Sequence, residues 1–70
     1  MSDKLDLHGV KHEDVHNTVK RFVEDHWADY GARLEIITGH SEQMMKLVET
    51  ELDRYGLSHY REPAVIMVDF

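Results

Sequence analysis

The stretch Leu5-Asp6-Leu7-His8-Gly9 constrains the fold more than any other, because apolar and ionisable side chains alternate and the alternation stops at a glycine. Successive side chains of a β-strand point to opposite faces. A strand here would place Leu5 and Leu7 in a core, with Asp6 and His8 on an open face or at the strand's C-terminal end. Ligands usually bind at that end of an α/β sheet, and Gly9 can adopt the positive φ of a tight turn. An ordinary buried first strand with a solvated Asp and His would leave the same pattern.

The length of the chain, 70 residues, predicts one domain over residues 1–70. A domain of this size buries only about 60% of the surface that its unfolded chain exposes, so we expect function on an open face or a turn. The absence of cysteine excludes disulfides and thiolate chemistry. No apolar run approaches the ~20 residues that span a bilayer, and residues 1–4 do not resemble a signal peptide. A cytoplasmic protein without membrane contact is therefore expected.

The chain is acidic, with 14 Asp and Glu against 8 Lys and Arg and a formal net charge of -6. Nucleic-acid binding through the overall field needs Lys and Arg that displace counterions, so this charge disfavours it and leaves only a local site open. Histidines could reduce the negative charge as the pH falls towards about 6. The chain has six of them, His8, His12, His16, His26, His40 and His59.

Residues 11–30 predict a helix, because their apolar side chains recur at helical spacing, and Gly31 is a suitable stop. Residues 33–38 predict a strand, and residues 41–55 predict a second helix that ends before Gly56. The expected core-facing side chains are Val15, Val19, Phe22, Val23 and either His26 or Trp27 in the first helix, and Met44, Leu47, Val48, Leu52 and Tyr55 in the second.

The last part of the chain predicts a hairpin. Residues 57–62 read as a weak polar strand, Pro63 interrupts it, and residues 64–70 read as a strong strand. The order is then β-α-β-α-β-β, and right-handed crossovers place both helices on one face of a mixed sheet. We therefore expect an α/β fold, a two-layer sandwich with a mixed four-stranded sheet.

Both early strands end in a glycine turn that leads into a helix. If these strands are neighbours, Gly9 and the turn Thr38-Gly39-His40-Ser41 lie at the same edge of the sheet. The start of the second helix offers unpaired N–H groups at the positive end of a dipole, which suits a phosphate. Thr38 and Ser41 add hydroxyl donors, and His40 could donate to a phosphate oxygen or act as a general acid. Ser41 could equally serve only as the N-cap, and Gly39 only as a turn residue.

Alternation also predicts that Asp6, Glu35 and Asp69 project from the face that the helices leave bare. Three carboxylates on one face could bind a divalent cation such as magnesium, because hard cations prefer oxygen ligands. They could equally form a solvated acidic surface.

Residues 12–16, His-Glu-Asp-Val-His, match the H-E-x-x-H pattern in which two histidines hold zinc. The pattern lies in the first turn of a predicted surface helix, and His26, the next histidine, is about 15 Å further along it. We therefore expect no peptidase, and we expect His12 to cap the helix or pack near its start. A serine nucleophile is also rejected, because no serine lies in a Gly-x-Ser-x-Gly turn.

Together the two glycine turns resemble those of the Smr (small MutS-related) domain family. The resemblance rests on Leu5-Asp6-Leu7-His8-Gly9 and on Ile36-Ile37-Thr38-Gly39 with His40-Ser41, extends to the last strand, and is that of a compact stand-alone version of the domain. It implies a fold like the C-terminal domain of translation initiation factor three and association with nucleic acid. Some members nick DNA or cleave RNA, and others act in ribosome quality control or in recombination suppression.

By this resemblance, Asp6 and His8 match the first functional motif of the family, and Thr38-Gly39 with His40 match the second. The second motif is shorter than is usual in the family. The basic loop that often precedes the last strand is reduced to Arg61-Glu62-Pro63. Both differences remove backbone donors and positive charge from the surface that would meet a phosphodiester.

Three functions follow as hypotheses. The first is a metal-assisted nicking endonuclease, with His8 or His40 as acid or base and Asp6 binding the ion or orienting a histidine. The second is a module that binds DNA, RNA or the ribosome through Gly9, Thr38, Gly39 and Ser41 without cleaving it. The third is a protein-binding adaptor whose acidic face meets a basic partner. The sequence does not predict an oligomeric state.

Overall fold

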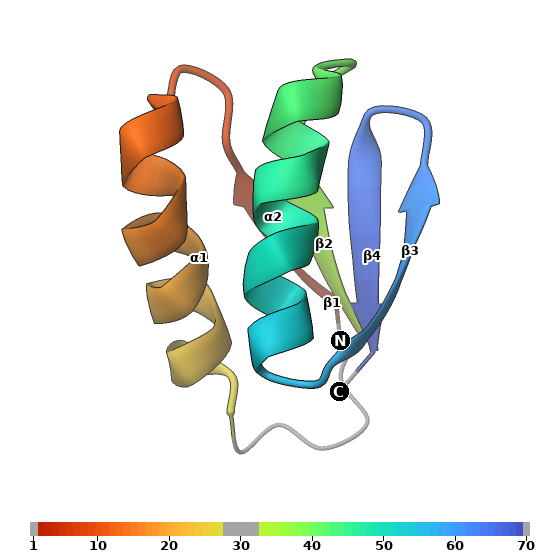
Figure 1. Ribbon diagram of the computed structural model, residues 1–70. Helices are drawn as coiled ribbons and strands as arrows, with labels where there is room; N and C mark the ends of the chain where they lie inside the picture. Colours follow the sequence, from red (N-terminus) through yellow and green to blue (C-terminus); the bar gives the residue numbers. More distant parts are fainter. Residues whose placement is uncertain (1, 28–32, 70) are drawn as a thin grey trace.

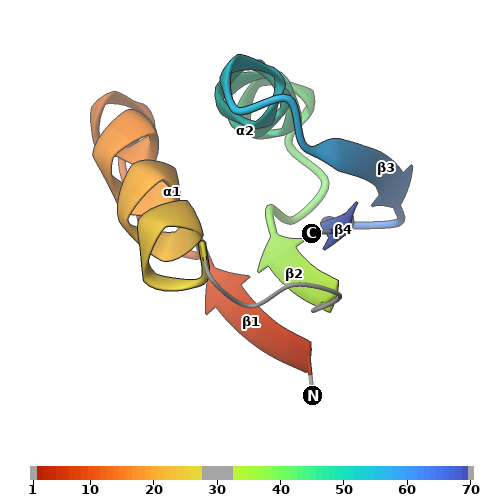
Figure 2. The same cartoon turned by 90° about the horizontal axis from the view of Figure 1, so that it is seen from below.

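The computed structural model describes residues 2–27 and 33–69, which form one sheet covered by two helices (Figure 1). The elements follow the predicted order and confirm the predicted fold class. They are β1 (Ser2–Asp6), α1 (His12–Asp25), β2 (Arg33–Ile37), α2 (Glu42–Arg54), β3 (Ser58–Glu62) and β4 (Val65–Asp69). Seen along the sheet, both helices lie on the same side of it (Figure 2). Neither helix is both long and apolar enough to cross a bilayer.

The strands of the described chain form a four-stranded sheet in the order β1-β2-β4-β3. β1 runs parallel to β2, with Leu5 opposite Ile36, while β4 is antiparallel to both β2 and β3. The parallel pair brings the C-terminal ends of β1 and β2 to one edge, as predicted. The turns that lead into α1 and α2 therefore leave the sheet side by side.

The hydrophobic core lies between the helices and one face of the sheet. Leu7 is 2% exposed and belongs to this core, whereas Leu5 is only partly buried because β1 is an edge strand. The helical spacing predicted the buried residues of α1 correctly. In α2 it identified Met44, Val48 and Leu52, but Leu47 and Tyr55 are only partly buried, and Met45 and Glu51 are buried although they were not expected in the core. The core consists of Leu7, Leu34, Ile36, Ile66 and Val68 from the sheet, Val15, Val19, Phe22 and Val23 from α1, and Met44, Met45, Val48 and Leu52 from α2.

Helix α1 ends at Asp25, five residues before the predicted end. His26 leaves the helical conformation, and its ring Nδ1 donates to the Phe22 carbonyl at 2.8 Å, the group that would accept the next helical N–H. Its ring also packs on Phe22, so His26 rather than Trp27 occupies the core-facing position. Trp27 is 53% exposed. The predicted stop at Gly31 lies outside the described residues.

The β3–β4 hairpin turns through Pro63 and Ala64, with Glu62 opposite Val65. Proline fixes a negative φ at the first central position, and Ala64 takes a φ of 65°, so the turn has the form of a type II turn. A glycine is usual at the second central position. The alanine is therefore a strained residue, and the hairpin turn lies at the same edge of the sheet as the two glycine turns (Figure 1).

Candidate functional site

The first turn follows β1 and carries two of the side chains that the sequence singled out. The backbone N–H of Leu7 donates to the Ile37 carbonyl at 2.9 Å, which continues the parallel pairing one residue beyond β1. The Asp6 carboxylate accepts the backbone N–H of His8 at 2.8 Å, and Gly9 takes a φ of +81°. Asp6 therefore shapes the turn, while the His8 side chain is exposed to solvent.

The second turn is held against the β3–β4 hairpin. The backbone N–H groups of Thr38 and Gly39 both donate to the Ala64 carbonyl, at 3.0 and 2.9 Å. The Thr38 side chain is buried, and its hydroxyl lies 3.3 Å from the same carbonyl and 3.0 Å from that of Gly39. These donors have internal acceptors, so the phosphate contact that the sequence suggested for the Thr38 hydroxyl does not fit the structure. Thr38 instead positions the turn.

The start of α2 keeps donors that face the edge. Ser41 is the N-cap, as one interpretation of the sequence predicted, and its hydroxyl oxygen accepts the Met44 N–H at 3.2 Å. The hydrogen of that hydroxyl remains available for a second partner. The N–H groups of Glu42 and Gln43 belong to the first turn, where a helix supplies no acceptor. His40 is exposed beside them, and nothing lies within 4 Å of the position that a Cβ on Gly39 would take.

The start of α1 differs from the prediction. The N-cap is Lys11, which has an extended backbone and makes no side-chain capping hydrogen bond, so the expectation that His12 caps the helix is wrong. The Asp14 N–H donates to the Lys11 carbonyl at 2.9 Å, and His12 is exposed. Sequence reasoning overlooked Lys11 as a candidate contact. The sequence did indicate this residue, because Lys11 lies between the first glycine turn and the helix.

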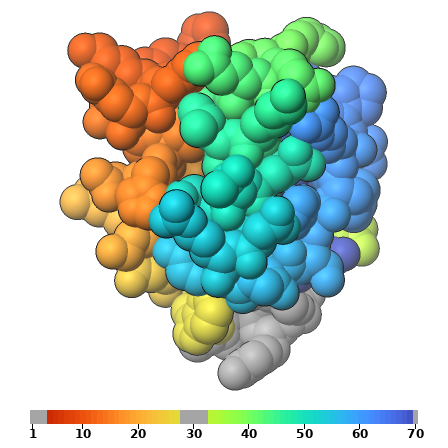
Figure 3. All heavy atoms as spheres, viewed as in Figure 1, coloured from red at the N-terminus to blue at the C-terminus, as the bar shows by residue number. Residues whose placement is uncertain are grey.

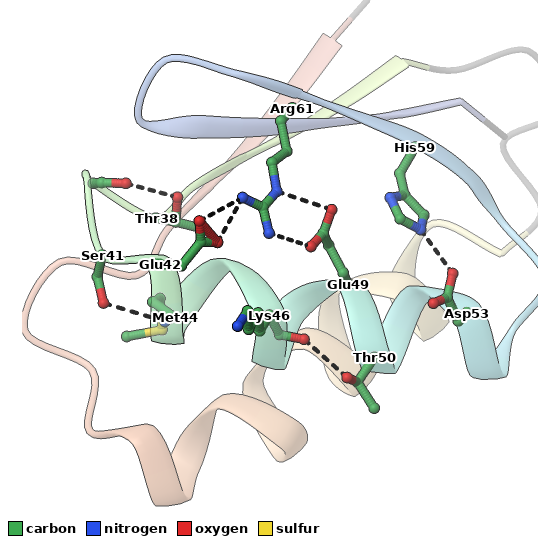
Figure 4. Close-up of polar contacts among 11 residues, drawn as sticks. Thr38, Ser41, Glu42, Met44, Lys46, Glu49, Thr50, Asp53, His59 and Arg61 are labelled. Atoms are coloured by element: carbon green, nitrogen blue, oxygen red, sulfur yellow. Dashed lines mark hydrogen bonds and ion pairs between the residues drawn. The ribbon is translucent and has the colours of Figure 1, made fainter.

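Arg61, the remnant of the expected basic loop, points towards α2 instead of solvent (Figure 4). Its guanidinium is 2.6 Å from Glu42 at Nη1 and 2.7 Å from Glu49 at Nη2, with a further bond to Glu49 from Nε at 3.1 Å. These hydrogen bonds raise the pKa of Arg61 and lower the pKa of Glu49, against a smaller opposing effect of desolvation. The charge of Arg61 is therefore neutralised within the protein.

The predicted acidic face is present, but its carboxylates do not converge. Strand register places Asp6, Glu35 and Asp69 on the face away from the helices, as alternation predicted. Lys4 lies 3.8 Å from Glu35, and Arg33 lies 3.3 Å from Asp69, so cations alternate with the carboxylates across the strands. Among residues 2–27 and 33–69, no group of three His, Asp or Glu side chains is placed to hold a metal ion. The three carboxylates therefore do not fit the magnesium site suggested above.

The fold and the two turns define a class, a two-layer α/β sandwich in which the parallel strands β1 and β2 end in glycine turns at one edge. A family model, the Smr domain, matches residues 5–66. The chain belongs to the Smr domain family, and this membership is consistent with a nucleic-acid-interacting function. No curated protein and no solved structure matches the chain.

Proposed function

We propose that the protein binds a nucleic-acid backbone at the edge of the sheet formed by His8, Gly9, Gly39, His40 and Ser41, which we call the turn edge. The observation that carries this proposal is the parallel pairing of β1 and β2, because it brings both glycine turns and both helix starts to one place. Family membership supports a nucleic acid as the ligand. The titration described below uses DNA and RNA separately and so determines which of them binds.

The contacts available to a phosphate are mostly neutral donors. The first turn of α2 offers unpaired N–H groups and the hydroxyl of Ser41, at the positive end of the helix dipole. Exposed imidazoles at His8 and His40 and the ammonium of Lys11 flank this position. Backbone amides at a helix start are an established way of binding phosphate, so the turn edge can receive one or two phosphates without a large basic surface.

The test is an amide NMR titration at low salt with a short branched DNA and, separately, a short RNA hairpin. We expect shifts at His8, Gly9 and residues 39–43, because these amides line the turn edge. The variant Lys11→Gln should weaken binding, whereas Lys20→Gln, which removes an exposed lysine further along α1, should leave it nearly unchanged. Shifts confined to the bare sheet face, or equal losses in both lysine variants, would contradict the placement of the site.

Nicking of the bound strand is the finer form of this proposal. Two exposed histidines at the turn edge could accept a proton from an attacking water and return one to the leaving oxygen. The variant His8→Ala should then abolish nicking of a supercoiled plasmid or cleavage of the RNA. Asp6→Asn keeps an oxygen that can accept the His8 N–H and removes only the charge. This variant therefore shows whether cleavage depends on the charge of Asp6 or only on the shape of the turn. Binding without cleavage in the parent protein would identify a binding module.

A protein-binding adaptor is the alternative. The sequence placed its contact on the acidic open face of the sheet, where Lys4 and Arg33 pair with two of the carboxylates, so the exposed carboxylates of α1 are a second place for this contact. Glu13, Asp14, Glu24 and Asp25 are all exposed on this helix and outnumber the exposed Lys20 and Arg21 beside them, and the chain carries a net charge of -6. A basic protein or a ribosomal protein would suit such a surface. If neither nucleic acid produces shifts in the titration, this alternative replaces the proposed function.

A further inference from the structure

The two histidines of the H-E-x-x-H pattern face a shallow groove between the helices, where α1 and α2 lie side by side (Figure 3). His12 and His16 are one helical turn apart, so their Cβ atoms are about 6 Å apart on one side of α1. Both are exposed. The groove is lined by His12, His16, Leu47, Thr50, Glu51 and Arg54.

Glu51 is the unexpected member of this groove. It is 5% exposed although the helical pattern placed it outside the core-facing residues, and its Oε1 lies 2.6 Å from His16 Nδ1. Its second oxygen, Oε2, is buried and has no hydrogen-bond partner among the described residues. A buried acceptor without a partner is costly, so the contacts that Oε1 makes with His16 and Arg54 are the ones that compensate the buried carboxylate.

The contact with Glu51 determines which nitrogen of His16 is free. An ionised carboxylate can only accept a hydrogen bond, so in the neutral His16 ring the hydrogen lies on Nδ1 and Nε2 keeps its lone pair. The His16 side chain is 50% exposed, which leaves Nε2 open to a ligand. A histidine that donates Nδ1–H to a carboxylate and presents Nε2 is the arrangement found behind metal-bound histidines in proteins.

We propose that His12 and His16 bind a divalent transition metal ion such as Zn²⁺, with Glu51 as the residue that positions His16. Two imidazoles suit a borderline metal ion of this kind. Water would complete the coordination. With two protein ligands the site is a binding site and not a peptidase centre. The proposal does not depend on nucleic-acid binding at the turn edge.

The positive charge of Arg54 disfavours a cation in this groove, because its Nη1 lies 3.7 Å from Glu51 Oε1. Its side chain is 63% exposed, so it can swing into solvent when a cation enters. We therefore expect Arg54→Gln to tighten Zn²⁺ binding several-fold. An increase in affinity would distinguish the two roles of the groove, since a purely structural role predicts no change in metal affinity.

The test is calorimetric titration of the tag-free protein with zinc chloride at neutral pH, with the site located by NMR of the histidine rings. We expect one ion per chain, bound at His12 and His16. His12→Gln should weaken binding at least tenfold, and Glu51→Gln should weaken it by about 10- to 100-fold, the usual effect of removing a residue that orients a metal ligand. The control His59→Gln removes a histidine that bonds to Asp53, and it should leave the affinity unchanged.

Zinc binding that survives His12→Gln, or that shifts other histidine rings instead, would overturn the proposal. Because Glu51 is buried, Glu51→Gln could also affect folding, so a second measurement is made on the parent protein. Long-range proton–nitrogen NMR should show the hydrogen of the neutral His16 ring on Nδ1 before zinc is added. A hydrogen on Nε2 would remove the basis of the site.

Discussion

Ala64 shows how a single residue links the hairpin to the second turn. Its carbonyl accepts the N–H groups of Thr38 and Gly39, while its own backbone holds a φ of 65°, a conformation that is unfavourable for a residue with a Cβ. Positive φ at such residues costs of order 1 kcal/mol or more. The strain lies at the turn edge, beside the groups that we propose to meet a phosphate.

We expect Ala64→Gly to stabilise the protein by about 0.5–1 kcal/mol, because the relief of strain exceeds the added entropy of the unfolded chain. Urea unfolding followed by circular dichroism would measure it. Gly39→Ala is the matched control, since Gly39 has a φ of +71° and open space around the new Cβ, and it should destabilise the protein by a similar amount. A less stable Ala64→Gly protein would show that the alanine methyl group contributes packing that outweighs its strain.

At the scale of elements, Arg61 fastens β3 to α2 through Glu42 and Glu49 (Figure 4). We expect Arg61→Gln to lower the urea midpoint at neutral pH, because both carboxylates lose their partner. The Arg61 bond holds the folded-state pKa of Glu49 below its usual value of 4.5. A lowered carboxylate pKa stabilises the folded state above the unfolded-state pKa, and that contribution disappears as the pH falls through the folded-state pKa.

The difference between the parent protein and Arg61→Gln should therefore be largest at neutral pH and should shrink below about pH 4. Arg33→Gln is the control, because it removes the same charge from a single exposed pair with Asp69. It should lower the midpoint less. A difference that stays constant down to acidic pH would mean that Arg61 acts by packing of its aliphatic stem and not through Glu49.

Local periodicity predicted the elements well. The alternation of Leu5-Asp6-Leu7-His8 and the apolar spacing of Val15, Val19, Phe22 and Val23 are properties of neighbouring residues, and the structure confirms both. The end of α1 was missed, because it depends on a bond between the His26 ring and the Phe22 carbonyl that helical spacing does not reveal.

Contacts between distant segments could not be predicted in this way. The bonds from Thr38 to Ala64 and from His16 to Glu51 join residues 26 and 35 positions apart, and each changes how a candidate residue is interpreted. In the structure, Thr38 positions the second turn, and Glu51 is the buried hydrogen-bond partner of His16. The parallel pairing of β1 and β2 was accessible from the sequence only because both strands precede a glycine turn and a helix.

The charge of the whole molecule sets how the turn edge can bind a nucleic acid. The net charge is -6, carboxylates occupy the first turns of both helices, and Arg61 is neutralised by Glu42 and Glu49. Few phosphates can therefore be contacted, and the affinity should rest on backbone amides and on Lys11 more than on the overall field.

Salt dependence measures this directly, because the slope of log affinity against log salt is about 0.9 per phosphate neutralised on double-stranded DNA. With one or two phosphates neutralised we expect a slope of roughly 1–2, so that affinity falls only about 4- to 16-fold between about 50 and about 200 mM salt. Fluorescence anisotropy of a labelled branched DNA would give the slope, and Lys11→Gln should lower it while Lys20→Gln should not. A slope of zero would indicate that no phosphate is neutralised by Lys11. A slope near that of a strongly basic protein would mean that a second, cationic surface contributes, which the described residues do not account for.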